Sequence, residues 1–279
     1  MNAVEVRGLT KKYKDFALRD ISFELPSGCV MGIIGENGSG KSTILRSVLG
    51  MVNADGGEIR IFGEKAGDFQ KNDIGIVMDE IGVPQFFDAR ETETVMKNSF
   101  SNWNSEIFHS YLEKFRLPEK KDIKKFSKGM KMKMSIAIAL SHDAKLLVMD
   151  EPTSGLDPLI RDEIIDIFTE FTREEDHSIL LSSHIVSDLE KLCDYIAFVH
   201  NGELILCQEK DRLLEQYGIM NTTEEILADI EPTAVIGKKS TGWGVEAMVD
   251  RAMIPHTFDI KPISIEEIFV FMVKGAKRR

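Results

Sequence analysis

The sequence predicts an α/β fold, in which a mostly parallel sheet is flanked by helices and carries an inserted α-helical subdomain. Two observations predict this fold. Short apolar runs alternate along the chain with segments of helical composition, as expected where parallel strands are joined by helices. Between about residues 86 and 142 the strand signals disappear, and three successive segments have helical spacing: Ala89–Phe100, Glu106–Phe115 and Gly129–Leu140.

The composition limits the classes of protein that the chain can belong to. The 279 residues are 43% hydrophobic, enough for a sizeable core in about two domains or subdomains. The net charge of −11 argues against a dominant non-specific affinity for nucleic acid or anionic lipid. The N-terminal residues lack the pattern of a secretory signal, and no run reaches the ~18 apolar residues of a membrane-spanning helix. We therefore expect a soluble chain, with any membrane role supplied by partners.

The cysteines Cys29, Cys193 and Cys207 are odd in number, widely spaced and set in apolar surroundings. This pattern does not suggest a disulfide framework or a zinc site. We expect three buried thiols in a reducing compartment.

Five strands are expected in the first part of the chain. They are residues 4–9 and 21–25, then Val30–Ile34, Glu58–Phe62 and Ile74–Met78. The first two strands are separated by a polar stretch in which Tyr13 and Phe16 offer aromatic rings, and one of these rings could stack on a purine. The strand Val30–Ile34 leads into a glycine-rich loop. Helix formers at helical spacing follow that loop, in Thr43–Leu49.

The alternation resumes beyond the helical insert. Leu146–Met149 is a buried strand, and Pro158 suits the first turn of a helix that runs to about Arg173, because the missing N–H of proline has no helical partner there. Ile179–Ser182 and Tyr195–His200 are further strands. From about residue 208 the pattern loosens, until the capping box Ser264-Ile265-Glu266-Glu267 starts a short apolar helix.

The residues Gly35-Glu36-Asn37-Gly38-Ser39-Gly40-Lys41-Ser42 fit G-x-x-x-x-G-K-[ST], the phosphate-binding loop of nucleotide hydrolases. Glycines let successive N–H groups face phosphate oxygens, and the helix that follows adds its positive end. Lys41 supplies a cation for the β- and γ-phosphates, and the Ser42 hydroxyl can ligate Mg²⁺. A chance glycine-rich turn is the alternative, and the strand and helix on either side disfavour it.

Asp150 and Glu151, directly after a buried strand, supply the second half of the predicted site. A carboxylate at this position holds Mg²⁺, usually through water, and the next acid can polarise the water that attacks the γ-phosphate. Alone, two acids after a strand would more often form a solvated turn or a helix cap. Beside the phosphate loop they indicate a Mg²⁺-dependent nucleotide hydrolase.

With these motifs in this order, residues 3–207 resemble the nucleotide-binding subunit of an ATP-binding cassette (ABC) transporter. Each motif of that family has a counterpart here. Tyr13 matches the aromatic that stacks on adenine, Gly35–Thr43 the phosphate loop, Ser127-Lys128-Gly129-Met130-Lys131 the signature usually written LSGGQ, Leu146–Glu151 the magnesium strand, Ser154-Gly155-Leu156-Asp157 the D-loop, and His184 the switch histidine.

The resemblance implies a domain organisation and a set of site residues. Residues 1–207 would form the ABC ATPase domain, a P-loop NTPase core with an antiparallel N-terminal β subdomain and a helical subdomain at about 86–142; residues 208–279 would form a C-terminal extension. Lys41, Glu151 and His184 would be catalytic, and Ser42, Asp79 and Asp150 would hold Mg²⁺. ATP would be bound by Tyr13, Gly35, Glu36, Asn37, Gly38, Ser39, Gly40, Lys41, Ser42, Thr43, Ser127, Gly129 and Asp157.

The signature would act on a second chain. It is the N-terminus of a helix, so the N–H groups of Ser127 and Gly129 make a second anion site. The resemblance implies that this site faces the γ-phosphate of ATP bound by another subunit. Two ATP molecules would then lie between two chains in a head-to-tail dimer, whether those chains are identical or homologous, and one chain alone would be a poor ATPase.

Two departures from the family pattern matter. Ile74–Met78 should lead into a glutamine that contacts Mg²⁺ and the attacking water, but the aligned residue is Asp79. Gln85 is the alternative, and choosing it would make the helical insert unusually short. A carboxylate can still ligate Mg²⁺, yet it adds negative charge beside the phosphates, so slower hydrolysis is a hypothesis. In the signature, Lys128 replaces the usual glycine and could contact either phosphate or solvent.

The sequence as a whole is interpreted as an ATP-hydrolysing subunit that powers a membrane ABC transporter of the export type. Its expected partners are transmembrane permease subunits on separate chains and a second nucleotide-binding subunit, with no nucleic acid, and its expected location is the cytoplasmic face of the cell membrane.

Pro84–Phe87 is a candidate contact with the permease, unless both phenylalanines are core residues. The alternative is a cytosolic ABC ATPase acting on ribosomes, DNA or cluster assembly. A single uninterrupted cassette without heptads, and the acidic balance, disfavour that alternative.

Overall fold

The computed structural model describes residues 1–65, 71–78 and 81–276. The chain divides into two compact units, Met1–Leu204 and Ile205–Arg279. The boundary expected after residue 207 lies within the strand β10 (Glu203–Glu209), which spans the point of division. No helix in the described ranges is long and apolar enough to cross a membrane.

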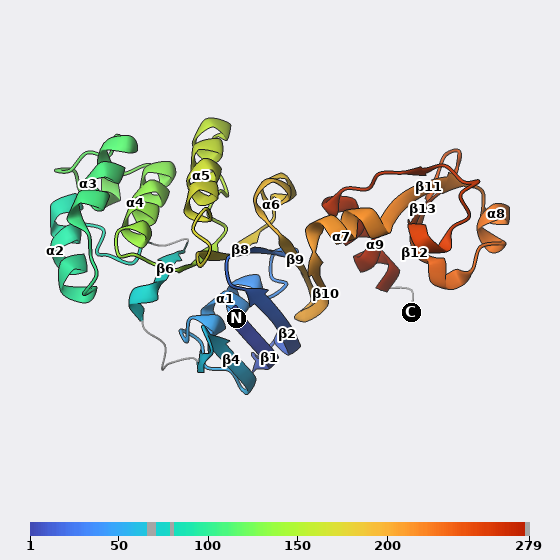
Figure 1. Cartoon of the computed structure of the whole chain (residues 1–279), viewed down its shortest axis with the longest axis horizontal. Coiled ribbons are helices and arrows are strands. Elements are labelled where there is room, and N and C mark those ends of the chain that lie inside the picture. The colour runs from blue at the N-terminus through green and yellow to red at the C-terminus, as the bar shows by residue number, and fades with distance from the viewer. Residues whose placement is uncertain (66–70, 79–80, 277–279) are drawn as a thin grey trace. The chain divides into compact units, whose positions relative to one another are not determined.

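The first unit contains parallel strands in the order β9-β3-β8-β7-β6, and Figure 1 labels β6, β8 and β9 among them. The strands are β3 (Val30–Ile34), β6 (Ile74–Val77), β7 (Leu146–Asp150), β8 (Ser178–Ser183) and β9 (Tyr195–His200). Every residue of β3, β7 and β8 is buried, as is usual for parallel sheets, which are covered on both faces. Because the strands are parallel, Ile34 pairs with Ser183 and Asp150 with Ser182. Their carboxyl ends therefore share one edge, where α/β folds bind ligands.

An antiparallel sheet in the order β2-β1-β4-β5 is formed by residues on both sides of β3 and α1 in the sequence. Its strands are β1 (Asn2–Lys12), β2 (Ala17–Pro26), β4 (Gly56–Ile61) and β5 (Glu64–Lys65). The helix α1 (Lys41–Val48) packs against β4 as well as against β7 and β8 of the parallel sheet. The predicted α/β fold with an antiparallel N-terminal part is confirmed.

The helical insert consists of α2 (Ala89–Ser99), α3 (Ser105–Lys114), the 3₁₀ turn η2 (Ile123–Lys125) and α4 (Lys128–Leu140). Figure 1 shows α2, α3 and α4 grouped together in green. Asp88 starts α2 with a complete capping box, and the Asn104 side chain caps α3. After the insert come α5 (Pro158–Phe171), with Pro158 in its first turn as predicted, and α6 (Val186–Leu192).

The second unit has its own antiparallel sheet, in the order β12-β13-β11-β14. The elements after β10 are α7 (Lys210–Gln216), β11 (Tyr217–Thr222), α8 (Glu224–Ala228), the turn η3 (Pro232–Ala234), β12 (Val235–Thr241), β13 (Gly244–Asp250), the turn η4 (Arg251–Met253), β14 (Ile260–Lys261) and α9 (Ile265–Ala276). Met220, Leu227, Ala247 and Val249 belong to a separate buried core in this unit.

The sequence analysis assigned one element of this region, the helix after Ser264, and left residues 208–262 unassigned. The capping box before α9 is confirmed, since the Ser264 Oγ accepts from the Glu267 N–H at 3.2 Å and the Glu267 carboxylate accepts from the Ser264 N–H at 2.9 Å. The region in which the sequence pattern loosens, from about residue 208, folds into the strands and helices of this unit. Four residues in a row at the start of β11 are buried, so this strand lacks the alternation by which strands are recognised in a sequence.

The expectation of three buried thiols is wrong for two of the three cysteines. Cys193 is buried, but Cys29 and Cys207 are partly exposed. Cys29 lies in the turn before β3, and Cys207 lies in β10, where the five central residues are all half-buried.

Candidate functional site

The loop from Gly35 to Gly40 joins β3 to α1 and requires glycine for steric reasons. A Cβ on Gly35 would lie 2.3 Å from the Val199 carbonyl oxygen. Gly40 has a φ of +114°, and a Cβ there would lie 2.5 Å from Leu18 Cδ2. Gly40 is also the residue that precedes α1, and no side chain caps that helix. The first N–H groups of α1 are therefore left for an anion.

Two polar side chains inside this loop indicate what the anion would contact. Lys41 is only 6% exposed, and its Nζ donates to the Gly35 carbonyl at 2.8 Å and, more weakly, to the Glu36 carbonyl at 3.4 Å. The Ser39 hydroxyl is buried and has no hydrogen-bond partner within the described part of the chain. A buried ammonium held by carbonyl oxygens and an orphaned hydroxyl both suit a phosphate ligand.

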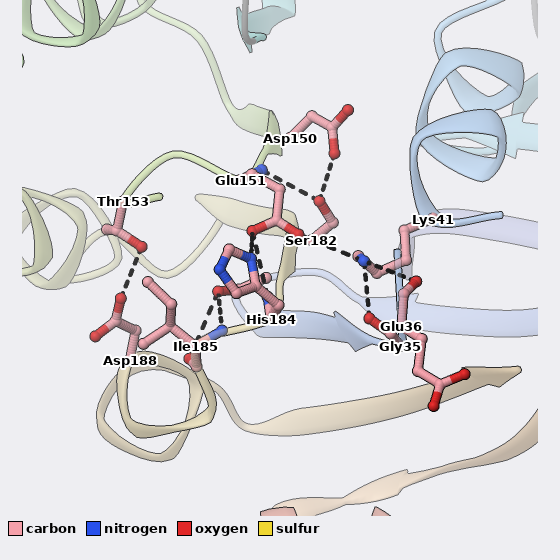
Figure 2. Close-up of polar contacts among 11 residues, drawn as sticks. Gly35, Glu36, Lys41, Asp150, Glu151, Thr153, Ser182, His184, Ile185 and Asp188 are labelled. Atoms are coloured by element: carbon pink, nitrogen blue, oxygen red, sulfur yellow. Dashed lines mark hydrogen bonds and ion pairs between the residues drawn. The ribbon is translucent and has the colours of Figure 1, made fainter. Parts of the chain in front are cut away.

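Figure 2 shows that Glu151 connects this lysine to the far side of the site. One carboxylate oxygen of Glu151 lies 3.4 Å from Lys41 Nζ. The other accepts from His184 Nδ1 at 2.5 Å and from the His184 backbone N–H at 3.2 Å. Three segments that are distant in the sequence thus meet in one network of contacts, and all three predicted catalytic residues belong to it.

Ser182 holds the two acids in place, and the sequence analysis missed this role. Its hydroxyl donates to Asp150 Oδ1 at 2.5 Å and accepts from the Glu151 N–H at 3.1 Å. Glu151 has a φ of +52°, a left-handed conformation that is unfavourable for glutamate and that needs support from its surroundings. The signal that could have found Ser182 is the parallel register, which places it directly opposite Asp150.

The signature and D-loop residues form a second cluster within the chain. Ser127 caps α4 by accepting from the Met130 N–H at 3.2 Å, and Asp157 caps α5 by accepting from the Ile160 N–H at 3.1 Å. A Cβ on Gly129 would lie 3.1 Å from Ile160 Cδ1, so the starts of α4 and α5 pack closely. The Ser154 N–H of the D-loop donates to the Glu151 carbonyl at 3.1 Å. Among the residues that the structure describes, no hydrogen bond or ion pair joins Ser127, Gly129 or Asp157 to Lys41 or Glu151.

Lys128, the unusual signature residue, is exposed. Its Nζ lies 3.0 Å from the position that a Cβ would take on Gly155 of the D-loop. Because Gly155 has no side chain and a φ of +69°, the lysine can lie across the loop at this point.

The two rings near the N-terminus have different surroundings. Phe16 is half-buried, and its Cζ lies 2.9 Å from where a Cβ on Gly40 would be. Tyr13 is 48% exposed, with its ring centroid 6.4 Å from that of Phe16. Of the two rings, Tyr13 is exposed enough to stack on a ligand, whereas Phe16 packs against the phosphate loop at Gly40.

Asp79, the predicted glutamine substitute, lies outside the described residues, so its role stays a prediction. Gln85 is exposed, and its carbonyl accepts from the Lys124 N–H at 2.7 Å. In the described ranges no three His, Cys, Asp or Glu side chains gather into a metal-binding group. Ser42 is half-buried in the first turn of α1, and Asp150 is buried at the end of β7.

An apolar groove of about 690 Å³ lies beside α1, β6 and the helical insert. Met51, Ile76, Phe100 and Arg46 are among its lining residues. His142 also lines it, with its ring stacked on Phe100 at 4.1 Å, and burial lowers the pKa of this histidine. The His142 imidazole is therefore uncharged at neutral pH, and the positive charge on the groove lining comes from Arg46.

The predicted contact segment gives a mixed result. Phe86 is 66% exposed, which rules out a core role for this ring. Phe87 is half-buried and meets Phe86 edge to face at 5.1 Å.

Comparisons with known proteins agree with this geometry. The sequence profile of the family described as "ABC transporter" matches residues 18–154. The chain is 35% identical to the lantibiotic transport ATP-binding protein SrtF of Streptococcus pyogenes over 211 residues, which cover 75% of this chain and 91% of that protein. It is 34% identical to the Nod factor export ATP-binding protein I of a Rhizobium species over 224 residues, with coverages of 77% and 73%.

Solved structures show the same fold. An ATP-binding subunit of an ABC transporter superposes with a TM-score of 0.69 at 27% identity, over 77% of this chain and 92% of that one. A dimeric ATP-binding cassette in a post-hydrolysis state, bound to ADP and phosphate, gives a TM-score of 0.66 at 21% identity, over 74% and 98% of the two chains.

Proposed function

The chain belongs to the ABC transporter family as an ATP-binding subunit, an ATPase that powers transport, and from this membership we propose how its residues divide the work. The observation that carries the proposal is the contact of Glu151 with both Lys41 and His184. It joins the phosphate loop, the residue after β7 and the residue after β8 in one site, at the edge of the sheet where a nucleotide would bind.

ATP is the substrate that fits this site. The loop N–H groups and Ser39 would bind the phosphates, and Lys41 would exchange its carbonyl partners for phosphate oxygens. Ser42, Asp150 and the predicted Asp79 are the residues that would hold Mg²⁺, which would neutralise part of the phosphate charge. Tyr13 would stack on the adenine.

Glu151 and His184 would act on the γ-phosphate. Their mutual contact must open when a phosphate enters, which frees the Glu151 carboxylate to orient the attacking water and His184 to donate a hydrogen bond to the γ-phosphate. The water attacks in line, and the bond between the γ-phosphorus and the ADP oxygen breaks. The loop N–H groups and Lys41 stabilise the charge that develops on the phosphate oxygens.

The second half of each site would come from another nucleotide-binding subunit. Ser127, Gly129 and Asp157 already serve their own chain by capping and packing α4 and α5. Ser127 nevertheless remains exposed, so the start of α4 can face a partner. A head-to-tail dimer, closed on two ATP molecules, would bring this helix start to the γ-phosphate of the opposite site.

The apolar groove is the proposed docking site for a membrane-spanning permease on a separate chain. Met51 is 57% exposed and Ile76 38% exposed on its lining, which is unusual for side chains of this kind unless they meet a partner. Arg46 forms no ion pair within residues 1–65, 71–78 and 81–276. The occupant is therefore a short apolar helix of the permease that carries a carboxylate for Arg46.

The names of two relatives support a direction of transport. Two similar proteins are named for lantibiotic transport and Nod factor export, so we propose an exporter. A docked permease would hold the chain at the cytoplasmic face of the membrane.

Two substitutions test the assignment of the catalytic residues. Lys41→Ala removes the cation that contacts phosphate, so we expect ATP affinity to fall at least tenfold. Glu151→Gln keeps the shape and loses the base, so we expect ATP affinity within about threefold of the parent and turnover lowered at least a hundredfold. Calorimetric titration and a phosphate-release assay measure the two quantities.

Lys145→Ala is the matched control, because this exposed lysine pairs with Asp176 away from the site. It should change neither quantity. Hydrolysis by Glu151→Gln at the parent rate would remove Glu151 from the proposed role.

A further inference from the structure

Tyr13 follows the last residue of β1, and its backbone N–H donates to the Phe16 carbonyl at 2.7 Å, which closes a short turn. Its ring is half exposed and is not enclosed by the core. A ring in this position could adopt several orientations, and a nucleotide would have to select one of them at a cost in binding free energy. What restrains the ring is therefore important for nucleotide affinity.

Lys11 provides a restraint from within the chain. Its Nζ lies over the Tyr13 ring, 5.8 Å from the centroid, a cation–π arrangement. The Lys11 side chain is only 18% exposed, so it is held along the protein surface. One face of the tyrosine ring is thus occupied by an ammonium group.

Asp55 in turn holds Lys11. Its carboxylate lies in the turn before β4 and accepts from Lys11 Nζ at 3.0 Å and from the Lys12 backbone N–H at 2.6 Å. The Asp55 N–H donates to the Thr10 carbonyl at 2.8 Å. These three bonds attach the turn to the end of β1 next to Tyr13.

From this chain of contacts we propose that Asp55 is a positioning residue for the nucleobase, acting through Lys11 on Tyr13. Lys11 occupies one face of the ring, so a purine would stack on the opposite face. The inference rests on the proposed function, because it requires that Tyr13 stacks on the base. Asp55 and Lys11 themselves touch neither the base nor the phosphates in this arrangement.

The charge on Asp55 persists over the working range of pH. The hydrogen bond from the Lys12 N–H, followed by that from Lys11, lowers the pKa of Asp55 below its ordinary value. The ion pair with Lys11 is therefore present in any neutral buffer used for the test.

Asp55→Asn tests the proposal while preserving the turn. Asparagine can still accept from the Lys12 N–H, but it loses the charge that holds Lys11. We expect the dissociation constant for ATP, measured by calorimetry on the full chain in Mg²⁺-free buffer, to rise about two- to fivefold, the range of an exposed cation–π contact. Inorganic tripolyphosphate has no base, so its affinity should stay unchanged.

Lys11→Met, which keeps most of the side-chain stem, should reproduce this selective loss. Glu58→Ala is the matched control, because this nearby acid pairs with Arg60 instead and its loss should change neither affinity. In a Tyr13→Ala background, Asp55→Asn should have no further effect on ATP binding.

The possible results distinguish a failure of the Asp55 role from a failure of the proposed function. Equal losses for ATP and tripolyphosphate, or no loss for either, would overturn the positioning role of Asp55. An additional loss in the Tyr13→Ala background would overturn the route through the ring. If Tyr13→Ala itself left the preference for ATP over tripolyphosphate unchanged, the stacking role of Tyr13 in the proposed function would be wrong.

Discussion

Glu151, the proposed catalytic carboxylate, is held by its backbone as much as by its side chain. Its N–H donates to both the carbonyl and the hydroxyl of Ser182, at 3.1 Å each. A left-handed glutamate costs about 1 to 3 kcal/mol unless its surroundings fix it, and here one serine on the neighbouring strand supplies much of that support.

Ser182→Ala should therefore damage catalysis more than stability. The change removes the hydrogen bond to Asp150 and one of those to Glu151, so we expect turnover at low Mg²⁺ to fall about tenfold. Loss of one buried hydrogen-bonding hydroxyl should lower the free energy of unfolding by about 1 kcal/mol. Steady-state hydrolysis across a Mg²⁺ series and urea unfolding measure the two effects.

Ser178→Ala is the control for this prediction. It lies on the same strand, is fully buried, and accepts from the Gly28 N–H at 2.9 Å. Its loss should cost similar stability without changing turnover. A Ser182→Ala protein that behaves in the same way would show that Ser182 is only a packing residue.

At the residue scale, the sequence predicts the participants but not their contacts. Motif order identified Lys41, Glu151 and His184, since each has a fixed place in a known pattern. Ser182 was not found because its role comes from the register between β7 and β8. Asp55 was not found because it touches Lys11 only after the turn before β4 folds back onto β1.

At the scale of elements, local signals worked where one feature dominates. The strand, glycine loop and helix of the phosphate site, and the capping box before α9, depend on short-range chemistry. The sheet of the second unit depends on packing from both faces, which removes the alternation from β11. The helical insert was found as a set of helices, but the groove beside it combines α1, β6 and α4 and has no signature in any one segment.

The groove yields a prediction at this scale. Met51→Glu and Ile76→Glu place a charge on exposed apolar lining, so each should lower the fraction of the chain that sediments with membrane vesicles from its own cells at least fivefold, with hydrolysis by the isolated chain unchanged. Ile226→Glu, in α8 of the second unit, is matched for exposure at 41% against 38% for Ile76. It should sediment like the parent. Normal sedimentation of both groove variants would exclude the groove as the permease contact.

At the scale of the whole molecule, we propose that one chain holds two different half-sites. Lys41, Glu151 and His184 form one, and the start of α4 with Ser127 and Gly129 forms the other. Within the described part of the chain, no hydrogen bond or ion pair joins Ser127 or Gly129 to the residues of the first half-site. This separation is expected if each half completes a site on a second subunit. A sequence could indicate this only through family resemblance, because the two halves meet between chains.

The most direct test is the rate of ATP hydrolysis per subunit of the purified chain, measured over a wide range of protein concentration at saturating ATP. If the two half-sites meet between chains, the rate per subunit should rise with concentration, as pairs of chains form, and then reach a plateau. A rate per subunit that is substantial and constant down to concentrations at which size-exclusion chromatography shows only monomer would contradict it, because one chain would then complete its own catalytic site.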